Sequence, residues 1–123
     1  MDANDITGEI IDAAMHVHSA LGPGLLESAY EACLKHELLS RDFKVLSQVI
    51  LPVIYKKSII DAGYRIDLLV EDEIVVELKA VERIIPIHEA QLLSYLKLSN
   101  KRIGLLINFN VLRLKYGIKR LAN

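Results

Sequence analysis

The chain has 123 residues, of which 52% are hydrophobic and 25% charged, and its formal net charge is −1. This length and composition predict one compact domain over residues 1–123 with a packed core, and they exclude a disordered chain. The near-neutral charge counts against a purely electrostatic duplex binder, which carries an excess of Lys and Arg. The single cysteine, Cys33, excludes an internal disulfide and a cysteine-rich zinc site.

The N-terminus is acidic and lacks the basic and apolar regions of a secretory signal. No apolar run reaches the roughly 18 residues that a bilayer-spanning helix needs. We therefore expect a cytoplasmic protein without a membrane partner.

The first third of the chain has helical spacing. From about Asn4 to Leu21, apolar residues recur three or four positions apart, and Asn4 is the expected N-cap. Gly22-Pro23-Gly24 then interrupts the helix. A second helix is expected from about Leu26 to Arg41, with Cys33 among the side chains that face the core.

The middle of the chain has the period of strands. Lys44 to Tyr55 alternates with a period of two, and Pro52 indicates a sheet edge or an irregular end. Ile59 to Val70 and Ile74 to Ala80 predict two further strands around the acidic tip Glu71-Asp72-Glu73. The second of these strands is apolar on both faces near its start, which is typical of a central strand.

The last third returns to a helix and then to strands. A helix is expected from about Ile87 to Leu98, and Arg102 to Asn108 predicts a buried strand. The tail from Val111 to Leu121 leaves room for one more short strand. The predicted order is α-α-β-β-β-α-β, which indicates an α/β fold with a mixed central sheet flanked by helices.

Asp67, Glu77 and Lys79 form the candidate catalytic group. Side chains two apart on a strand share a face, so Glu77 and Lys79 point the same way. A three-residue loop from Glu71 to Glu73 would set Asp67 opposite Glu77, whereas a two-residue turn would set it opposite Val76, on the wrong face. A reactive site at these residues therefore predicts the three-residue loop or a bulge.

Two adjacent carboxylates repel each other, and a cation such as Mg²⁺ relieves the repulsion by accepting oxygen ligands from both. A metal held in this way activates water and stabilises charge on a phosphate, while Lys79 can orient the water or stabilise the transition state. These parts suit hydrolysis of a phosphodiester. One alternative is a surface hairpin with exposed charges, because the acid-x-Lys pattern is common. Another is a structural pair between buried Glu77 and Lys79.

Two predicted helices supply further candidates. Gln91 and Tyr95 lie one turn apart on the third helix, and Tyr95 could touch a phosphate, although a plain polar helix surface is the alternative. Glu27, Tyr30 and Glu31 share a face of the second helix. Glu27 lies in the first turn, where a carboxylate also simply favours the helix dipole.

Other functional motifs are missing from the sequence. There is no HExxH motif, no Cys/His zinc spacing, no serine nucleophile elbow and no phosphate-binding glycine loop. The part of the chain from Lys97 onward contains Lys and Arg but neither Asp nor Glu. This basic C-terminal segment is the candidate for contacts with a nucleic-acid backbone, and a solvated surface is the alternative.

The segment Gly24-Leu25-Leu26-Glu27-Ser28-Ala29-Tyr30 resembles the signature of the GxxExxY proteins, which belong to the PD-(D/E)xK nuclease superfamily. The resemblance covers nearly the whole chain, from about Ile11 to Leu121, and includes Arg65 to Val70, Val76 to Val81 and His88 to Leu96. It implies a restriction-endonuclease-like core.

The resemblance also implies roles for individual residues. In related nucleases a Glu on an early helix joins the Asp and the ExK residues around the metal, which implies Glu27, Asp67 and Glu77 as metal ligands and Lys79 as the remaining catalytic residue. The exonuclease-like branch has a Gln-x-x-x-Tyr helix. The matching residues here would bind or orient the substrate, together with the signature tyrosine: Gln91, Tyr95 and Tyr30.

The first functional hypothesis is therefore a nuclease that depends on Mg²⁺ or Mn²⁺ and acts on DNA, with RNA or a structured junction as other substrates. The second is a non-catalytic module that keeps the fold and binds nucleic acid or protein, and an exposed apolar patch would support it. The third is a small domain whose buried charges are structural pairs. A homodimer is compatible with the size of the chain, although no heptad pattern argues for it.

Overall fold

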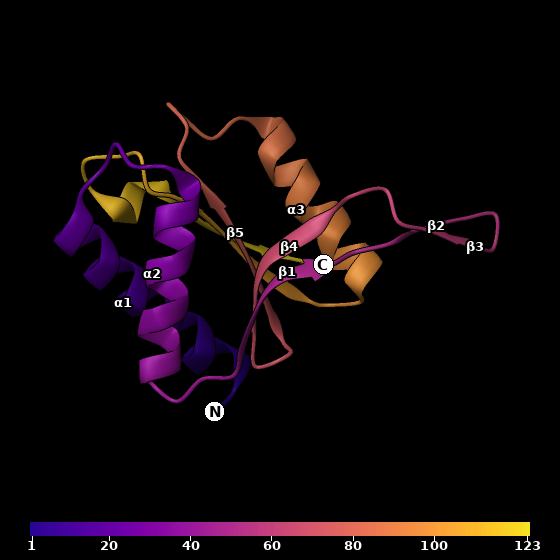
Figure 1. Ribbon diagram of the computed structural model, residues 1–123, viewed down its shortest axis with the longest axis horizontal. Helices are drawn as coiled ribbons and strands as arrows, with labels where there is room; N and C mark the ends of the chain where they lie inside the picture. The colour runs from indigo at the N-terminus through magenta and orange to yellow at the C-terminus, as the bar shows by residue number, and fades with distance from the viewer.

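A five-stranded mixed sheet with helices on both faces organises the chain, as the computed structural model shows for residues 1–123 (Figure 1). Only β5 and β6 pair in parallel, and all other neighbours in the sheet are antiparallel. The expected mixed α/β architecture is confirmed. The strands follow one another across the sheet in the order β1 (Val45–Ile50), β4 (Arg65–Val70), β5 (Ile74–Lys79), β6 (Ile103–Asn108) and β7 (Ile118–Ala122).

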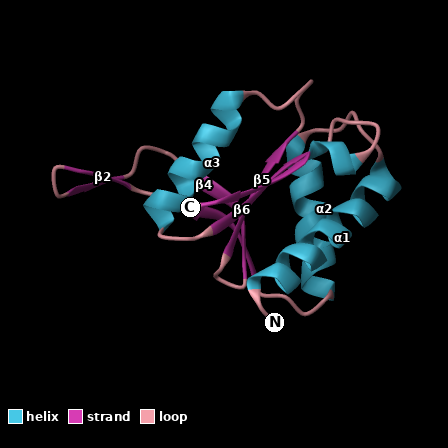
Figure 2. Cartoon of the chain, turned by 180° about the vertical axis from the view of Figure 1, so that it is seen from behind, coloured by secondary structure: helices cyan, strands magenta, loops and turns pink.

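The helices divide the core into two layers (Figure 2). Helices α1 (Ala3–Leu21) and α2 (Glu27–Ser40) pack on one face of the sheet, and α3 (Pro86–Ser99) packs on the other. Successive side chains of the central strand β5 point to opposite faces of the sheet and so contribute to both core layers. Val76 packs on the side of α1 and α2, and Val75 packs on the side of α3. None of these helices has both the length and the apolar character that crossing a membrane requires.

The start of α1 differs from the prediction. Asp2, and not Asn4, is the N-cap. The Asp2 carboxylate accepts a bond from the Asp5 N–H at 2.8 Å, and the Asp5 carboxylate accepts one from the Asp2 N–H at 3.3 Å. The expectation of Asn4 was wrong because this reciprocal arrangement satisfies two main-chain donors two residues earlier in the chain.

The expected burial of Cys33 was also wrong, because this side chain is exposed. Helix α2 buries a narrow stripe formed by Tyr30, Leu34 and Leu38, each four residues from the next. A residue one position before Leu34 is rotated by about a quarter of a turn from this stripe, so Cys33 lies outside the part of α2 that the sheet covers.

Two predicted strands are each divided by a break. The segment from Lys44 to Tyr55 forms β1 and then the short strand β2 (Val53–Tyr55), with Pro52 between them. The segment from Ile59 to Val70 likewise separates into β3 (Ser58–Ile60) and β4, with Gly63 at φ 88° between them. Strands β2 and β3 pair only with each other, and the hairpin extends away from the main sheet (Figures 1 and 2).

The C-terminal part adds one strand to the predicted order. After β6, a short 3-10 helix, η1 (Leu114–Gly117), leads into β7. Strand β7 pairs with β6 and forms one edge of the sheet. The tail therefore contains the additional short strand for which the sequence left room.

Candidate active site

The loop between β4 and β5 has the length that the site required. Val70 pairs with Ile74 and Leu68 pairs with Val76, so three residues form the loop between the strands. Glu71 and Asp72 adopt left-handed backbone angles, with φ of 54° and 55°. This register sets Asp67 opposite Glu77, and the predicted three-residue loop is confirmed.

The main-chain ladder between β4 and β5 stops at the candidate residues. Its last pair is Leu68 with Val76. Beyond this pair, the Asp67 N–H donates to Glu77 Oε1 at 3.2 Å, and the Leu78 N–H donates to Asp67 Oδ2 at 2.9 Å. The two carboxylates thus replace main-chain carbonyls as hydrogen-bond acceptors. These bonds fix both carboxylates beside each other in the gap between the strands.

Gln48 on the edge strand β1 completes the surroundings of Asp67. Its backbone has φ 52°, and the residues on either side of it pair with β4 while Gln48 does not pair with Asp67. Its side-chain amide donates to Asp67 Oδ1 at 3.3 Å and to Glu31 Oε1 at 2.7 Å. Sequence patterns missed this residue, because a single Gln in a strand gives no functional signal by itself.

Burial and a neighbouring charge perturb Glu77. Only 4% of the residue is exposed. Burial, followed by the negative charge of Asp67, raises the pKa of Glu77 to about 9, although the Asp67 N–H and the Lys79 ammonium partly oppose this rise. No ion pair joins Glu77 to Lys79. The structure therefore does not contain the simple Glu–Lys pair that was the structural alternative.

Lys79 is connected to α3 through polar contacts. Its Nζ donates to Gln91 Oε1 at 3.3 Å, and the Gln91 amide donates to the Tyr95 hydroxyl at 3.4 Å. Tyr95 is buried, and burial, followed by the negative charges of Glu77 and Asp67, raises the pKa of its hydroxyl. The predicted helix residues Gln91 and Tyr95 thus lie next to the Asp67–Glu77 pair.

Glu27 lies at the rim of the same region. It is exposed in the first turn of α2. Partial burial within the folded chain raises the pKa of the Glu27 carboxyl. The charge of Lys79 opposes this rise, and the charge of Asp67 adds to it. Glu27 is therefore close enough to Asp67 and Lys79 to respond to their charges.

Tyr30 occupies a different position from the other predicted residues. It is fully buried, and its ring stacks on Phe109 with centroids 4.5 Å apart. Its hydroxyl donates to the Gly22 carbonyl at 2.6 Å and accepts from the Leu25 N–H at 3.1 Å. A direct contact between Tyr30 and a substrate does not agree with this burial. The side chain instead holds the loop that precedes Glu27.

A comparison with known families identifies the group to which this arrangement belongs. The model of the PD-(D/E)XK nuclease superfamily matches residues 4–121. The chain belongs to the PD-(D/E)XK nuclease superfamily. No curated protein and no solved structure matches the chain. The expected restriction-endonuclease-like fold is confirmed, and placement among the GxxExxY proteins stays a prediction.

Membership of a nuclease superfamily implies a nucleic-acid substrate and, in general, a divalent metal. No three His, Cys, Asp or Glu side chains converge into a group that could hold a metal ion. Asp67 and Glu77 do converge, and Mg²⁺ commonly binds through one or two carboxylates, with waters and substrate phosphates as its other ligands. The oxygen donors and the like-charge repulsion at Glu77 therefore fit such a cation, while Glu27 does not complete a three-residue set.

Asn108 at the end of β6 fixes the chain beyond Lys79, and sequence patterns missed it. Its buried side-chain amide accepts from the Val81 N–H at 3.1 Å and donates to the Val81 carbonyl at 3.0 Å. The Phe109 N–H also donates to the Lys79 carbonyl at 2.9 Å. The only available signal was a polar residue at the end of an otherwise apolar strand.

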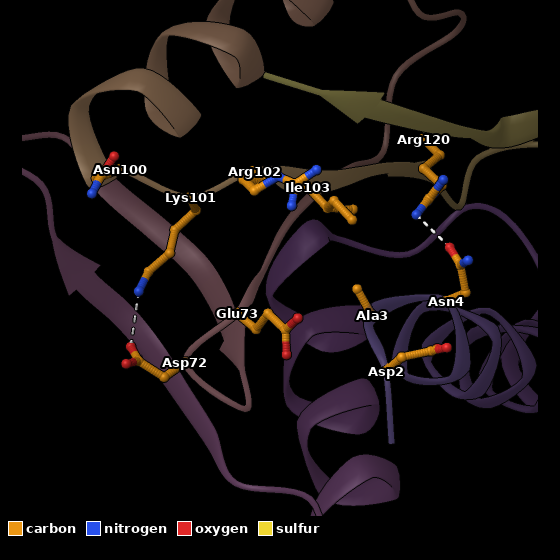
Figure 3. Close-up of a pocket in the computed structure, with 10 residues that line it drawn as sticks. All are labelled: Asp2, Ala3, Asn4, Asp72, Glu73, Asn100, Lys101, Arg102, Ile103 and Arg120. Atoms are coloured by element: carbon orange, nitrogen blue, oxygen red, sulfur yellow. Dashed lines mark hydrogen bonds and ion pairs between the residues drawn. The ribbon is translucent and has the colours of Figure 1, made fainter.

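Two basic residues of the C-terminal segment, Lys101 and Arg120, lie away from the candidate site. They line a separate cavity of about 510 Å³ (Figure 3). This cavity lies at the amino ends of β5 and β6, whereas Lys79 is the last residue of β5. There Lys101 forms an ion pair with Asp72 at 3.2 Å, and Arg120 donates to the Asn4 side chain at 2.7 Å. These cations interact within the chain, so they are poor candidates for contacts with a strand bound at Glu77.

Proposed function

We propose that the protein is a divalent-metal-dependent nuclease that hydrolyses phosphodiester bonds, with DNA as the favoured substrate. The main support is the opening of the β4–β5 ladder at the Asp67–Glu77 pair. There two carboxylates accept main-chain hydrogen bonds side by side, and Lys79 follows on the same strand face as Glu77.

Asp67 and Glu77 are the proposed ligands for Mg²⁺ or Mn²⁺. When bound, the ion supplies Lewis-acid stabilisation of the phosphate and a more acidic water. Lys79 supplies a fixed positive charge for the phosphate as negative charge develops on it, and its contact with Gln91 holds the amine in place. Tyr95 supports Gln91 from the next turn of α3.

Glu27 and Tyr30 have supporting roles in this proposal. Glu27 is an exposed acid at the rim of the site, and it would join Asp67 and Glu77 when nucleic acid and metal are bound. Tyr30 positions Glu27 indirectly, because its hydroxyl bonds hold the Gly22–Leu25 loop against the first turn of α2. Tyr30 thus acts through Glu27 and not through the substrate.

The test is cleavage of end-labelled DNA and RNA by the purified protein with Mg²⁺, Mn²⁺ or EDTA. Lys79→Ala is expected to reduce the cleavage rate by at least about 10²-fold, the scale for loss of a group that stabilises transition-state charge. Lys44→Ala removes an exposed lysine just before β1 and is the matched control. Cleavage by Lys79→Ala at the rate of the control would contradict the assigned role.

A second candidate function is a non-catalytic module that binds a protein partner, which includes a second copy of the chain in a homodimer. The exposed β2–β3 hairpin favours this candidate, because Ile54 is 64% and Ile59 is 76% exposed. An isolated two-stranded hairpin is only marginally stable in water, and Lys56 and Lys57 at its turn have φ of 47° and 69°. A contact with a partner would stabilise it.

Light scattering after size-exclusion chromatography tests the homodimer. A dimer that Ile54→Asp converts to a monomer would support association through the hairpin, whereas a monomeric wild-type protein at high concentration would contradict it. Metal-dependent cleavage that disappears in Lys79→Ala would reject the non-catalytic candidate as the sole function.

A further inference from the structure

A groove of about 580 Å³ lies between α3 and the end of β5, which carries Lys79. Lys79 and Gln91 line this groove and also belong to the proposed catalytic site, so the groove adjoins that site. Its walls also include Tyr64 from the chain before β4, and Ile87, His88 and Ser94 from α3. Sequence patterns gave no individual role to these four residues.

The charge of the groove differs from that of the carboxylate site beside it. None of the residues lining the groove is Asp or Glu, whereas Lys79 and His88 both line it. An anionic ligand that extends from the site would therefore meet a positive charge and no acidic side chain in this direction. This charge pattern matches a phosphate that continues along a nucleic-acid strand.

Tyr64 presents an aromatic surface to the groove. Its ring meets that of Tyr95 edge-on, with centroids 5.9 Å apart and an interplanar angle of 64°, yet 43% of Tyr64 stays exposed. Ile87 on the first turn of α3 is 65% exposed. An anchored and exposed aromatic ring near an apolar side chain is a suitable surface for stacking a base, since every base has a flat face.

The size of the groove limits the ligand. Pockets of about 300–1,000 Å³ enclose ligands the size of a drug molecule, which is also the scale of one or two nucleotides. A base that remains paired in a duplex is covered on both faces by its neighbours and must leave the stack to reach a side chain. The dimensions therefore suit an unpaired nucleotide and not a continuous duplex.

We propose that this groove binds an unpaired nucleotide of the substrate strand, with its base stacked on Tyr64 and its phosphate directed toward Lys79. The inference rests on the proposed nuclease function and narrows its substrate class to single strands, flaps or frayed ends. Gln91 and Ser94 offer hydrogen bonds to the nucleotide from the α3 side of the groove.

The test measures binding without cleavage, in a Glu77→Gln background and in EDTA. Fluorescence anisotropy is recorded with labelled oligothymidylate, with oligouridylate and with a blunt DNA duplex of the same length. Tyr64→Ala is expected to weaken binding of the single strands about tenfold, within the range for one lost stacking contact, and that of the duplex less than twofold. Tyr64→Phe keeps the ring and should bind within about twofold of its parent.

Tyr116→Ala is the matched control, because this tyrosine is 76% exposed on η1 and does not line the groove. Ala90→Glu gives an independent perturbation by placing a carboxylate at an exposed groove position on α3, with Ala32→Glu on α2 as its control. Both groove variants should weaken single-strand binding while both controls do not. Equal affinities for groove and control variants, or a duplex bound as tightly as the single strands, would overturn the proposal.

The two proposals can fail separately. If single-strand binding depends on Tyr64 but the wild-type protein cleaves nothing with Mg²⁺ or Mn²⁺, the groove assignment holds and the nuclease assignment fails. If the protein cleaves duplex DNA and Tyr64→Ala has no effect on binding, the nuclease assignment holds and the groove assignment fails. The comparison of the two oligonucleotides also shows whether DNA or RNA is the preferred strand.

Discussion

Replacement of Glu77 by Gln is expected to stabilise the metal-free protein. The Gln side chain has the same shape as a protonated Glu, so its oxygen can accept from the Asp67 N–H while its amide donates to the Asp67 carboxylate. Glu77 has a pKa of about 9 in the folded protein against an ordinary value of 4.5. Folding at pH 7 therefore requires Glu77 to take up a proton, whereas the neutral amide of the Glu77→Gln variant avoids this cost.

The size of the effect follows from proton linkage. Because the pKa is raised on folding, the folded state binds more protons than the unfolded state between pH 4.5 and 9, and stability falls as pH rises through this window. One pH unit corresponds to about 1.4 kcal/mol. The interval of about 2.5 units from 4.5 to pH 7 gives a stabilisation of about 3 kcal/mol for Glu77→Gln.

Urea unfolding in EDTA at several pH values between 5 and 8 measures this effect. The difference in unfolding free energy between Glu77→Gln and wild type should be below about 1 kcal/mol at pH 5 and should grow by about 1.4 kcal/mol per pH unit. Glu82→Gln removes a charge from an exposed residue and should change stability by less than about 0.5 kcal/mol. A variant less stable than wild type at pH 7, or a difference that does not change with pH, would refute the reasoning.

Three further predictions concern the metal and the supporting residues. Mg²⁺ at ten times its Kd should stabilise wild type by about 1.4 kcal/mol in thermal unfolding and should have little effect on Glu77→Gln; equal shifts would argue against this carboxylate as a ligand. Tyr30→Phe should lower the unfolding free energy in urea by about 1–2 kcal/mol, because two loop hydrogen bonds are lost while the stacked ring is kept. Asn108→Ala should cost about 3 kcal/mol by the same measurement, since Val81 loses bonds to both its N–H and its carbonyl; a change below about 1 kcal/mol would contradict this role.

Local patterns predicted much of the fold and part of the site. The three long helices and the strands around the acidic tip follow from hydrophobic periods of 3.6 and 2, which depend only on neighbours in the chain. The same period of two places Glu77 and Lys79 on one face. The requirement that Asp67 face Glu77 then predicted the length of the β4–β5 loop, and the register confirms it.

Local patterns were less informative about breaks and about the outer faces of helices. The alternation from Lys44 to Tyr55 continues across Pro52, so it did not reveal that β2 leaves the sheet to pair with β3. Cys33 was expected in the core because small apolar residues are often buried. Its exposure depends on how narrow a stripe of α2 the sheet covers, which is a property of packing.

The sequence by itself determined the succession of helical and strand regions along the chain, the face shared by Glu77 and Lys79, and the residue types of the acid–acid–lysine group. Only the tertiary structure decided that the β4–β5 ladder opens at Asp67, that Gln48 approaches from β1, and that Glu77 is buried with a raised pKa. The physical reason is that side-chain spacing follows from the local chain geometry. Hydrogen-bond replacement and desolvation depend on groups that folding brings together from distant parts of the chain.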